Sequence, residues 1–427
     1  MAASEGREFT RFVIRGGRRL SGRYPVQGNK NAALPLLAAS ILHPGPVEFR
    51  RIPAILDVER MAAILDHIGV RVERQPGVLT VDGTAVRSPV LAAEQVEQLR
   101  GSILLWSALA ARFGRVDSGI PGGCPIGRRA FDVHWKVFRS AGFEIVSKHG
   151  RFLILKTEDI SRPEVYLDES SVTATENALI LYAGLGGGTI WNPAREPHVL
   201  ALIEFLRRIG CELELGPICF RVRRGPHQHA AKIMMEVPAD YIDAGTAAIA
   251  AGVTGGQVEL AGVEPEDLLG VRSQLEGFGL EFEETRVGVL VDAGEKPLRS
   301  PDKVTAGLWP GFPTDLTSIA VVLATRSRGL CLIHDWLYES RMFFVDKLVR
   351  MGARITVCDP HRVIVEGPVQ LRGTHLESPD IRAGMALLVA GLAASGTTRI
   401  ERAEVVHRGY ERVAERFAAL GADISVE

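Results

Sequence analysis

Hydrophobic and polar positions repeat along this chain with a period of about 70 residues, which indicates copies of one structural unit. Six times a helical pattern ends in a hydrophobic residue and a glycine, and an alternating apolar and polar stretch follows. The glycines are Gly69, Gly142, Gly210, Gly279, Gly352 and Gly421. Glycine suits a helix end because it adopts the left-handed conformation without a Cβ penalty, and the alternation predicts a strand. The chain is therefore predicted to contain six α/β units.

Each unit also holds a short segment that is apolar on all sides, which is typical of a helix buried in a core. These segments are 32–42, 103–111, 178–185, 245–253, 316–325 and 383–394. We therefore expect an inside-out arrangement, with buried helices and outer sheets, in two domains of three units each.

The expected first domain is 22–237, and the second combines 1–21 with 238–427. The boundary falls in the loop-like stretch 223–238, and strand 12–15 cannot complete the first unit by itself. Two chain crossings between the domains would form a hinged cleft, where ligands usually bind.

Composition excludes several classes of protein. The chain of 427 residues has 50 Lys and Arg against 51 Asp and Glu, so no global field recruits nucleic acid or a membrane surface. Five cysteines without paired spacing predict neither a disulfide framework nor a metal site, and reduced thiols favour a cytoplasmic location. No apolar run is long enough for a membrane span. The oligomeric state stays open.

Cys124 is the most unusual of the five cysteines. It lies in the segment 121–129, PGGCPIGRR, whose three glycines and two prolines predict an exposed loop. Free cysteine is usually buried, and the neighbouring Arg128 and Arg129 would favour its thiolate form. The other four cysteines lie in or beside predicted strands, where we expect core positions.

Lys30 follows a glycine turn and precedes a buried helix, so its ammonium could bind an anion at the helix start, or lie in solvent as an ordinary surface lysine. Asp315 precedes another buried helix and suits a helix cap as well as a catalytic base.

Three arginines lie at unit junctions in the second half, at Arg341, Arg382 and Arg408. Arg382 precedes a helix so apolar that its guanidinium must lie near a buried helix start and needs an anionic partner. Asp380 could supply that partner, or a substrate carboxylate could be held bidentately.

Together these motifs resemble the family of UDP-N-acetylglucosamine enolpyruvyltransferase, a relative of 5-enolpyruvylshikimate-3-phosphate synthase. The motifs are GNKNAALP, PGGC-x-IG-x-R, FPTD, D-x-R and RGYER, and they follow one another along essentially the whole chain. The resemblance implies two domains of three βαβαββ units that close over the ligands. It also implies transfer of the enolpyruvyl group of phosphoenolpyruvate to a hydroxyl of a uridine nucleotide, with no metal or redox cofactor.

The resemblance also assigns roles to individual residues. The catalytic set would be Cys124, which fosfomycin alkylates in the family, with Asp315, Lys30, Arg408 and Asp380. Phosphoenolpyruvate would be bound by Lys30, Arg100, Arg129, Arg341, Arg382 and Arg408. The acceptor would contact Asn31, Arg129, Phe131, Asp132, His134, Ser171, Val172, Thr173 and Asp315.

Departures from the family pattern fall on the acceptor side. Ala130 and Val133 stand where the family has a proline and a leucine that hold the uracil ring, and Phe131 would reshape that pocket. Glu169 stands where a lysine usually faces phosphate, and Thr173 replaces a glycine. The expected acceptor is the 3-hydroxyl of UDP-N-acetylglucosamine, a peptidoglycan precursor. One alternative is transfer to the 3'-hydroxyl of UMP, as in nucleoside-antibiotic pathways. A non-catalytic nucleotide-binding paralogue is the alternative of another class, although no motif residue of the catalytic set has been lost.

Overall fold

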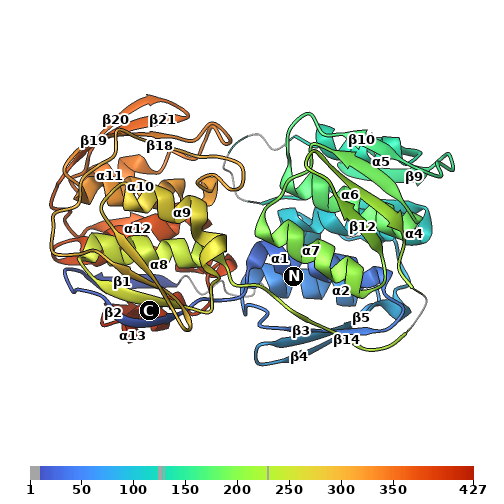
Figure 1. Ribbon diagram of the computed structural model, residues 1–427, viewed down its shortest axis with the longest axis horizontal. Coiled ribbons are helices and arrows are strands. Elements are labelled where there is room, and N and C mark those ends of the chain that lie inside the picture. The colour runs from blue at the N-terminus through green and yellow to red at the C-terminus, as the bar shows by residue number, and fades with distance from the viewer. Residues whose placement is uncertain (1–9, 124–126, 128–129, 228–229) are drawn as a thin grey trace, which may run out of the picture. The chain divides into compact units, whose positions relative to one another are not determined.

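The computed structural model describes residues 10–123, 127, 130–227 and 230–427. They form two compact units (Figure 1). We call residues 28–123 and 130–238 the Lys30 unit, and residues 10–27 and 239–427 the Asp315 unit. Each unit encloses three central helices within three four-stranded sheets. Of the helices in the described ranges, none combines the length and apolar character that a bilayer crossing requires.

Each sheet of the Lys30 unit contains one parallel and two antiparallel strand pairs. The first has the order β14 (Ile233–Glu236), β3 (Pro46–Arg50), β5 (Val78–Asp82) and β4 (Arg71–Gln75). The second has the order β6 (Val90–Leu91), β7 (Arg115–Gly119), β9 (Arg151–Lys156) and β8 (Phe143–Lys148). The third has the order β10 (Glu164–Tyr166), β11 (Gly188–Trp191), β13 (Cys219–Arg224) and β12 (Glu212–Leu215).

The sheets of the Asp315 unit repeat this topology. The first has the order β16 (Glu281–Thr285), β17 (Gly288–Asp292), β15 (Gln257–Ala261) and β2 (Ser21–Pro25). The second has the order β18 (Lys303–Thr305), β19 (Gly329–His334), β21 (Arg362–Gly367) and β20 (Arg354–Asp359). The third has the order β22 (His375–Glu377), β23 (Thr397–Glu401), β1 (Arg11–Arg15) and β24 (Asp423–Val426).

One central helix belongs to each of the six units of sequence. They are α1 (Lys30–Ala39), α4 (Leu104–Phe113), α6 (Val172–Leu185), α8 (Tyr241–Thr254), α10 (Thr314–Arg326) and α12 (Ile381–Ala393). Shorter or more peripheral helices are α2 (Leu56–His67), α3 (Ala93–Val96), α5 (Asp132–Ser140), α7 (Pro197–Arg208), α9 (Leu269–Glu276), α11 (Val345–Arg350) and α13 (Val413–Ala419). The 3₁₀ helices are η1 (Ser40–Leu42), η2 (Gly83–Ala85), η3 (Arg100–Ile103), η4 (Pro265–Leu268) and η5 (Ala403–Arg408).

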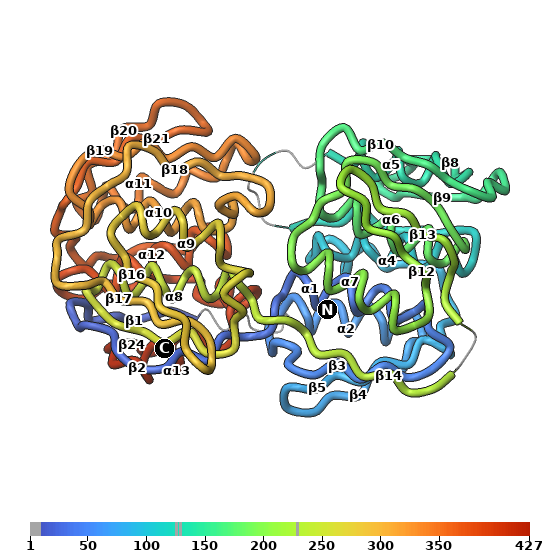
Figure 2. Tube along the Cα trace, viewed as in Figure 1, coloured from blue at the N-terminus to red at the C-terminus, as the bar shows by residue number. Residues whose placement is uncertain are grey.

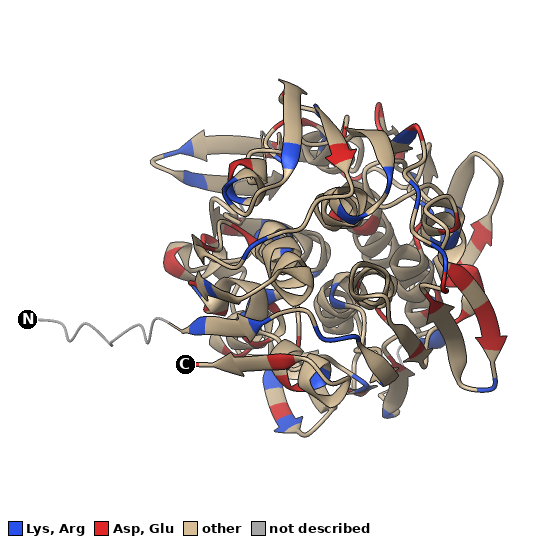
Figure 3. Ribbon diagram, turned by 90° about the vertical axis from the view of Figure 1, so that its left-hand side faces the viewer, with Lys and Arg blue, Asp and Glu red and all other residues tan. Residues whose placement is uncertain are grey.

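The central helices are buried as the apolar segments predict. Every residue of α12 is buried, and α8, α10 and α12 all pack against one another. Figure 3 shows that the charged residues lie mostly on the outer strands and at helix ends. Because an element that is apolar on all sides must be covered on all sides, this confirms the inside-out arrangement of helices and sheets.

All six repeat glycines adopt the conformation that the pattern predicts. Their φ angles lie between 79° and 99°, in the left-handed region where a side chain would be strained, and each stands between a helix and the strand that follows. The repeat in the sequence is therefore a repeat of helix ends, one in each of six related units.

The first strands of two repeats are exchanged. The elements β2, α1, β3, α2, β4 and β5 follow the βαβαββ order, as do β14, α8, β15, α9, β16 and β17. However, β2 pairs with β15 and β14 pairs with β3. In Figure 2 the N-terminal strands, in blue, accordingly lie among the yellow and red segments of the Asp315 unit. This exchange makes both units discontinuous in sequence.

Three expectations differ from the structure. The first crossing follows Gln27 and not residue 21, because all of β2 is bound in the sheet of β15. The stretch 223–238, expected as a loop, contains β14, whose exposed and buried residues alternate too briefly to be recognised. Cys358 is exposed at an irregularity of β20, whereas Cys211, Cys219 and Cys331 are buried as expected.

A buried ion pair joins three elements of the Asp315 unit. Asp243 on α8 is fully buried and accepts hydrogen bonds from Arg416 Nη1 at 2.6 Å and Nη2 at 3.1 Å. It also accepts from the Tyr24 hydroxyl at 2.8 Å and the Gln27 backbone N–H at 3.1 Å. Since Tyr24 lies on β2 and Arg416 on α13, this carboxylate fixes the exchanged strand to the core.

We expect Asp243→Ala to lower the free energy of unfolding by about 3–5 kcal/mol, because it leaves the Arg416 guanidinium buried without its counter-ion. Equilibrium urea unfolding measures this change. The matched control is Asp423→Ala, which removes the partner of the exposed Arg18 and should cost about 1 kcal/mol or less. Equal effects of the two substitutions would contradict the role given to the buried pair.

Candidate active site

Within each unit, several candidate residues lie where the central helices begin. Lys30 is the first residue of α1, and Arg100 begins η3, which leads into α4. Thr173, Asp315 and Arg382 are each the second residue of their helix, in α6, α10 and α12. A helix start presents unpaired backbone N–H groups and a partial positive charge, so it favours anions. In five of the six repeats, the same end of the central helix therefore supplies a candidate polar residue.

Asp315 forms the centre of the cluster in the Asp315 unit. Its carboxylate accepts a hydrogen bond from Arg382 Nη2 at 2.7 Å and one from Arg341 Nη2 at 3.1 Å. The side chains of Arg341 and Arg382 are only 2% and 6% exposed, whereas that of Asp315 is 26% exposed. Pro313 is the N-cap of α10, so the interpretation of Asp315 as a helix cap is wrong.

Asp380 was expected as a possible partner of the Arg382 guanidinium, but it forms other hydrogen bonds. Its side chain caps α12 by accepting from the backbone N–H groups of Arg382 at 2.9 Å and Ala383 at 3.0 Å. The guanidinium of Arg382 pairs with Asp315 instead and lies 5.3 Å from the centre of the Tyr410 ring. Although burial alone would lower the pKa of Arg382, the charge of Asp315 raises it well above its usual value. Arg382 therefore stays charged in the core.

Asp335, which sequence reasoning missed, supports this cluster from beneath. It is fully buried, accepts from the Thr314 hydroxyl at 2.5 Å, and lies 3.8 Å from Arg341 Nε. Its other oxygen accepts from the backbone N–H groups of Leu337 and Tyr338. The available sequence signal was an aspartate immediately after strand β19, a place where buried carboxylates need specific partners.

Two guanidinium nitrogens of this cluster donate no hydrogen bond to any described residue. Within the described part of the chain, Arg341 Nε and Arg382 Nη1 are buried and have no hydrogen-bond partner. A buried donor without an acceptor is costly, and it is rarely kept unless a ligand or ordered water satisfies it. Both nitrogens belong to groups suited to carboxylate or phosphate. The cluster can therefore take an anion.

Lys30 is also placed in an ion pair. Its Nζ lies 3.1 Å from Asp57 Oδ2, and its side chain is 14% exposed, so the alternative of a solvated surface lysine is wrong. Asp57 is nearly fully buried in the first turn of α2, and Arg60 lies 3.6 Å from its other oxygen. Asn29 caps α1 by accepting from the Ala32 N–H at 3.1 Å. Sequence reasoning missed Asp57, which is distant from Lys30 in the chain.

Arg100 binds the two ends of the cysteine loop. Its guanidinium donates to the carbonyls of Pro121 at 3.3 Å and Ala130 at 3.5 Å, and lies 4.2 Å from the centre of the Phe131 ring. The predicted residues Cys124, Arg128 and Arg129 lie between these ends and outside the described residues.

His134 and Thr173 contact each other. The His134 Nε2 lies 3.4 Å from the Thr173 hydroxyl, and its Nδ1 lies 2.9 Å from Asn177 Nδ2. Burial and the nearby charge of Arg100 lower the pKa of His134 to about 3, so the ring is neutral. Phe131 stacks on Trp106 and Trp135. The departures at Phe131 and Thr173 thus both make packing contacts, Phe131 with two tryptophans and Thr173 with His134.

The remaining predicted residues lie at the margins of these groups. Asn31 and Val172 are half-buried in the first turns of α1 and α6, and Ser171 is the N-cap of α6. Asp132 is exposed at the start of α5. Arg408 is half-buried at the end of η5.

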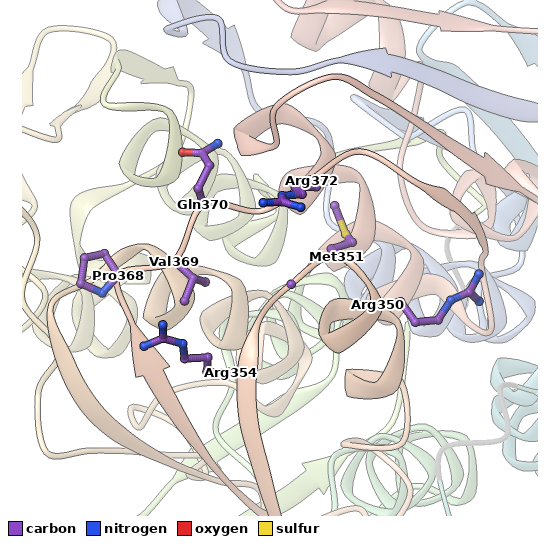
Figure 4. A pocket seen from close by; sticks show the side chains of 8 residues that line it. Arg350, Met351, Arg354, Pro368, Val369, Gln370 and Arg372 are labelled. Carbon is purple, nitrogen blue, oxygen red and sulfur yellow. The ribbon is translucent and has the colours of Figure 1, made fainter.

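A separate surface hollow of about 410 Å³ lies in the Asp315 unit, between the end of α11, β20 and the segment 368–372 (Figure 4). It contains Arg350, Arg354 and Arg372 but none of the predicted residues. Arg354 pairs with Glu366, and Arg350 donates to the carbonyl of His375. Figure 4 shows that the arginine side chains point in different directions, so the hollow lacks a convergent anion site.

Comparison with known proteins agrees with this arrangement. Residues 14–417 match the model of the EPSP synthase (3-phosphoshikimate 1-carboxyvinyltransferase) family. The chain is 36% identical to UDP-N-acetylglucosamine 1-carboxyvinyltransferase of Borrelia garinii subsp. bavariensis, over 97% of this chain and 98% of that protein. It is 38% identical to the protein of the same name from Bradyrhizobium diazoefficiens, with 97% of each chain covered.

Two solved structures share the fold. The enolpyruvyl transferase NikO from Streptomyces tendae aligns with a TM-score of 0.87 and 24% identity, over 98% of this chain and 99% of that one. EPSP synthase from Acinetobacter baumannii aligns with a TM-score of 0.75 and 18% identity, over 98% of this chain and 100% of that one. These likenesses confirm the two-domain, inside-out α/β fold.

Sequence relatives that span nearly the whole chain, a matching family model and a shared fold lead to one conclusion. The chain belongs to the EPSP synthase family and is a transferase of the 1-carboxyvinyl, or enolpyruvyl, group.

Proposed function

We propose that this enzyme transfers the enolpyruvyl group of phosphoenolpyruvate to the 3-hydroxyl of UDP-N-acetylglucosamine and releases phosphate. The observation that carries the proposal is the pair of buried arginines, Arg341 and Arg382, which share the carboxylate of Asp315 and keep unused donors. Such a site suits a substrate that brings a carboxylate next to the atoms that react.

Phosphoenolpyruvate would change how this cluster is paired. Its carboxylate can accept hydrogen bonds from Arg341 and Arg382, the same guanidinium groups that Asp315 now occupies. Each bond made to the substrate weakens the hold on Asp315, since donors and charge are shared. Asp315 then becomes the available base for the acceptor hydroxyl. Binding of one substrate would in this way prepare the proton acceptor for the other.

The reaction itself is addition followed by elimination. The acceptor oxygen bonds to C2 of phosphoenolpyruvate as C3 gains a proton, and phosphate then leaves C2 as C3 loses a proton. In this proposal Cys124 acts at the reacting carbons, Asp380 lies near them, and Lys30, Arg129 and Arg408 bind phosphate. Arg100 would contribute by holding the ends of the cysteine loop. Positioned acids, bases and anion clamps are sufficient for this chemistry, which calls for no cofactor.

The acceptor assignment is supported by relatives named UDP-N-acetylglucosamine 1-carboxyvinyltransferase that are 36–38% identical over 97% of the chain. Phe131, His134 and Thr173 are our proposed wall for the nucleotide, with Asn31, Asp132, Ser171 and Val172 as further contacts. A neutral His134 suits this role because it brings no charge to a uracil ring.

UMP is the second candidate acceptor, and Glu169 is the observation that favours it. This carboxylate is exposed two residues before Ser171, the cap of α6, and its backbone carbonyl accepts from the Ser171 N–H at 2.7 Å. A negative charge there opposes a diphosphate at the helix start, whereas a nucleotide with a single phosphate reaches less far.

We also propose a cytoplasmic location. The four cysteines in the described ranges carry free thiols, which fits a reducing compartment.

The deciding experiment is phosphate release from phosphoenolpyruvate with UDP-N-acetylglucosamine and with UMP offered separately. We expect turnover with the UDP-sugar and at most a trace with UMP. Preferential turnover with UMP would replace the proposed acceptor by the second candidate. An enzyme that is folded but inactive with both would refute the acceptor class.

Glu169→Lys should lower the KM for UDP-N-acetylglucosamine about 3–10-fold, because it replaces repulsion of a diphosphate by attraction. Steady-state kinetics with varied acceptor measure the effect. Glu144→Lys, the same charge change at an exposed position of β8, is the control and should leave the KM unchanged. If both variants behave alike, no diphosphate lies near residue 169.

Asp315→Asn should lower kcat about 10²- to 10⁴-fold, because an amide cannot take the proton of the acceptor hydroxyl. Single-turnover phosphate release measures this loss, and urea unfolding shows whether the fold survives beside the two arginines. Asp346→Asn, at an exposed position of α11, is the matched control. A folded Asp315→Asn protein with kcat within about tenfold of wild type would exclude the role of base.

A further inference from the structure

The side chain of Gln27 is buried in the Asp315 unit, with 6% of it exposed. Its amide has two N–H donors and two acceptor positions, and all four are used. Nε2 donates to the carbonyl of Gly409 at 2.8 Å and to Asp240 Oδ2 at 3.5 Å. Oε1 accepts from the Glu411 backbone N–H at 2.8 Å and from Arg416 Nη2 at 3.1 Å. Few substitutes could satisfy this environment.

The two backbone bonds lie on either side of Tyr410. One side-chain amide thus holds the carbonyl before Tyr410 and the N–H after it, which fixes the backbone at that residue. The Tyr410 side chain is 1% exposed, and its hydroxyl lies 3.0 Å from the Thr246 hydroxyl on α8. Gln27 therefore determines where this ring stands.

The Tyr410 ring in turn supports Arg382, whose guanidinium carbon lies 5.3 Å from the ring centre. Arg382 Nη2 then donates to Asp315 at 2.7 Å. The neighbouring Gly409 packs tightly on the start of α12, since a Cβ there would lie 2.8 Å from the side chain of Ile381. A continuous series of contacts thus joins Gln27 to the carboxylate at the centre of the cluster.

We propose that Gln27 is a positioning residue for phosphoenolpyruvate binding: its amide fixes the segment 408–411, which carries Arg408 and supports Arg382. Gln27 acts through these residues and does not itself touch the substrate. The inference rests on the proposed function in one respect: phosphoenolpyruvate is taken as the substrate whose binding is measured.

Replacement of Gln27 by glutamate tests the role of the two N–H donors of its amide. Gln27→Glu keeps the size of the side chain and the acceptor for Glu411 and Arg416, but turns a donor into an acceptor facing Gly409 and Asp240. Burial raises the pKa of Asp240 to about 6, so this carboxylate is charged at about pH 8 and repels the new one. The segment 408–411 must then shift away from its wild-type position.

At about pH 8, Gln27→Glu should raise the KM for phosphoenolpyruvate about tenfold or more, with kcat within about threefold of wild type. This split is expected because Arg408 and Arg382 are proposed to bind the substrate in both the ground state and the transition state. Gln257→Glu is the matched control, since the Gln257 amide also donates to an aspartate, Asp292, at 2.7 Å, but at an exposed position of β15. Its kinetics should equal those of wild type.

Gln27→Asn is the second variant, because the amide is retained one methylene too short to reach both backbone groups. Hydrogen exchange of the Glu411 N–H should become about tenfold faster than in wild type, whatever the substrate is. Unchanged exchange in this variant, or unchanged KM in a folded Gln27→Glu protein, overturns the inference. So does a loss of activity in Gln27→Glu that only follows its unfolded fraction. Absence of turnover in wild type would instead refute the proposed function and leave the exchange result valid.

Discussion

Complete enclosure of the central helices is the constraint on which the rest of the structure depends. A helix covered on every side can carry no charge along its length unless a partner is buried with it. Its ends are different, because the first turn presents N–H groups that need acceptors and a field that favours anions. In α12, Arg382 stands at that end, beside the capping Asp380. Packing three such helices together brings their polar ends into contact and creates a cluster without exposing the core.

Stability alone does not explain the ion pairs at these helix ends. Arg341 and Arg382 are held by Asp315 and retain donors that no described residue satisfies. A pair built only for stability would be expected to satisfy its donors, because each unsatisfied one costs free energy. The arrangement resembles a ligand site in which a protein carboxylate occupies part of the place of a substrate carboxylate. The support beneath it, from Asp335 and Tyr410, keeps the guanidinium groups in place.

The shared fold does not determine which acceptor substrate the enzyme uses. Proteins named for 3-phosphoshikimate and for UDP-N-acetylglucosamine share this family, and the fold is common to them. We therefore propose that specificity comes from side chains that depart from the family pattern, such as Glu169, Thr173 and Phe131. Thr173 contacts His134, so this replacement packs against another residue of the predicted acceptor set.

The sequence by itself determined the features that arise locally. Helix-ending glycines such as Gly69, all-apolar segments and the order of the motifs predicted six units, buried helices and the family, because each depends on neighbours within a few turns of chain. The local sequence also made Cys124 and Lys30 candidates for the site, and these assignments stay predictions.

Only the tertiary structure decided which distant groups meet. It assigned Asp315 instead of Asp380 as the partner of Arg382, paired Lys30 with Asp57, and exchanged β2 with β14. In each case several partners of similar chemistry were available along the chain. The choice among them depends on how helices and sheets pack, and a local sequence pattern does not determine that packing.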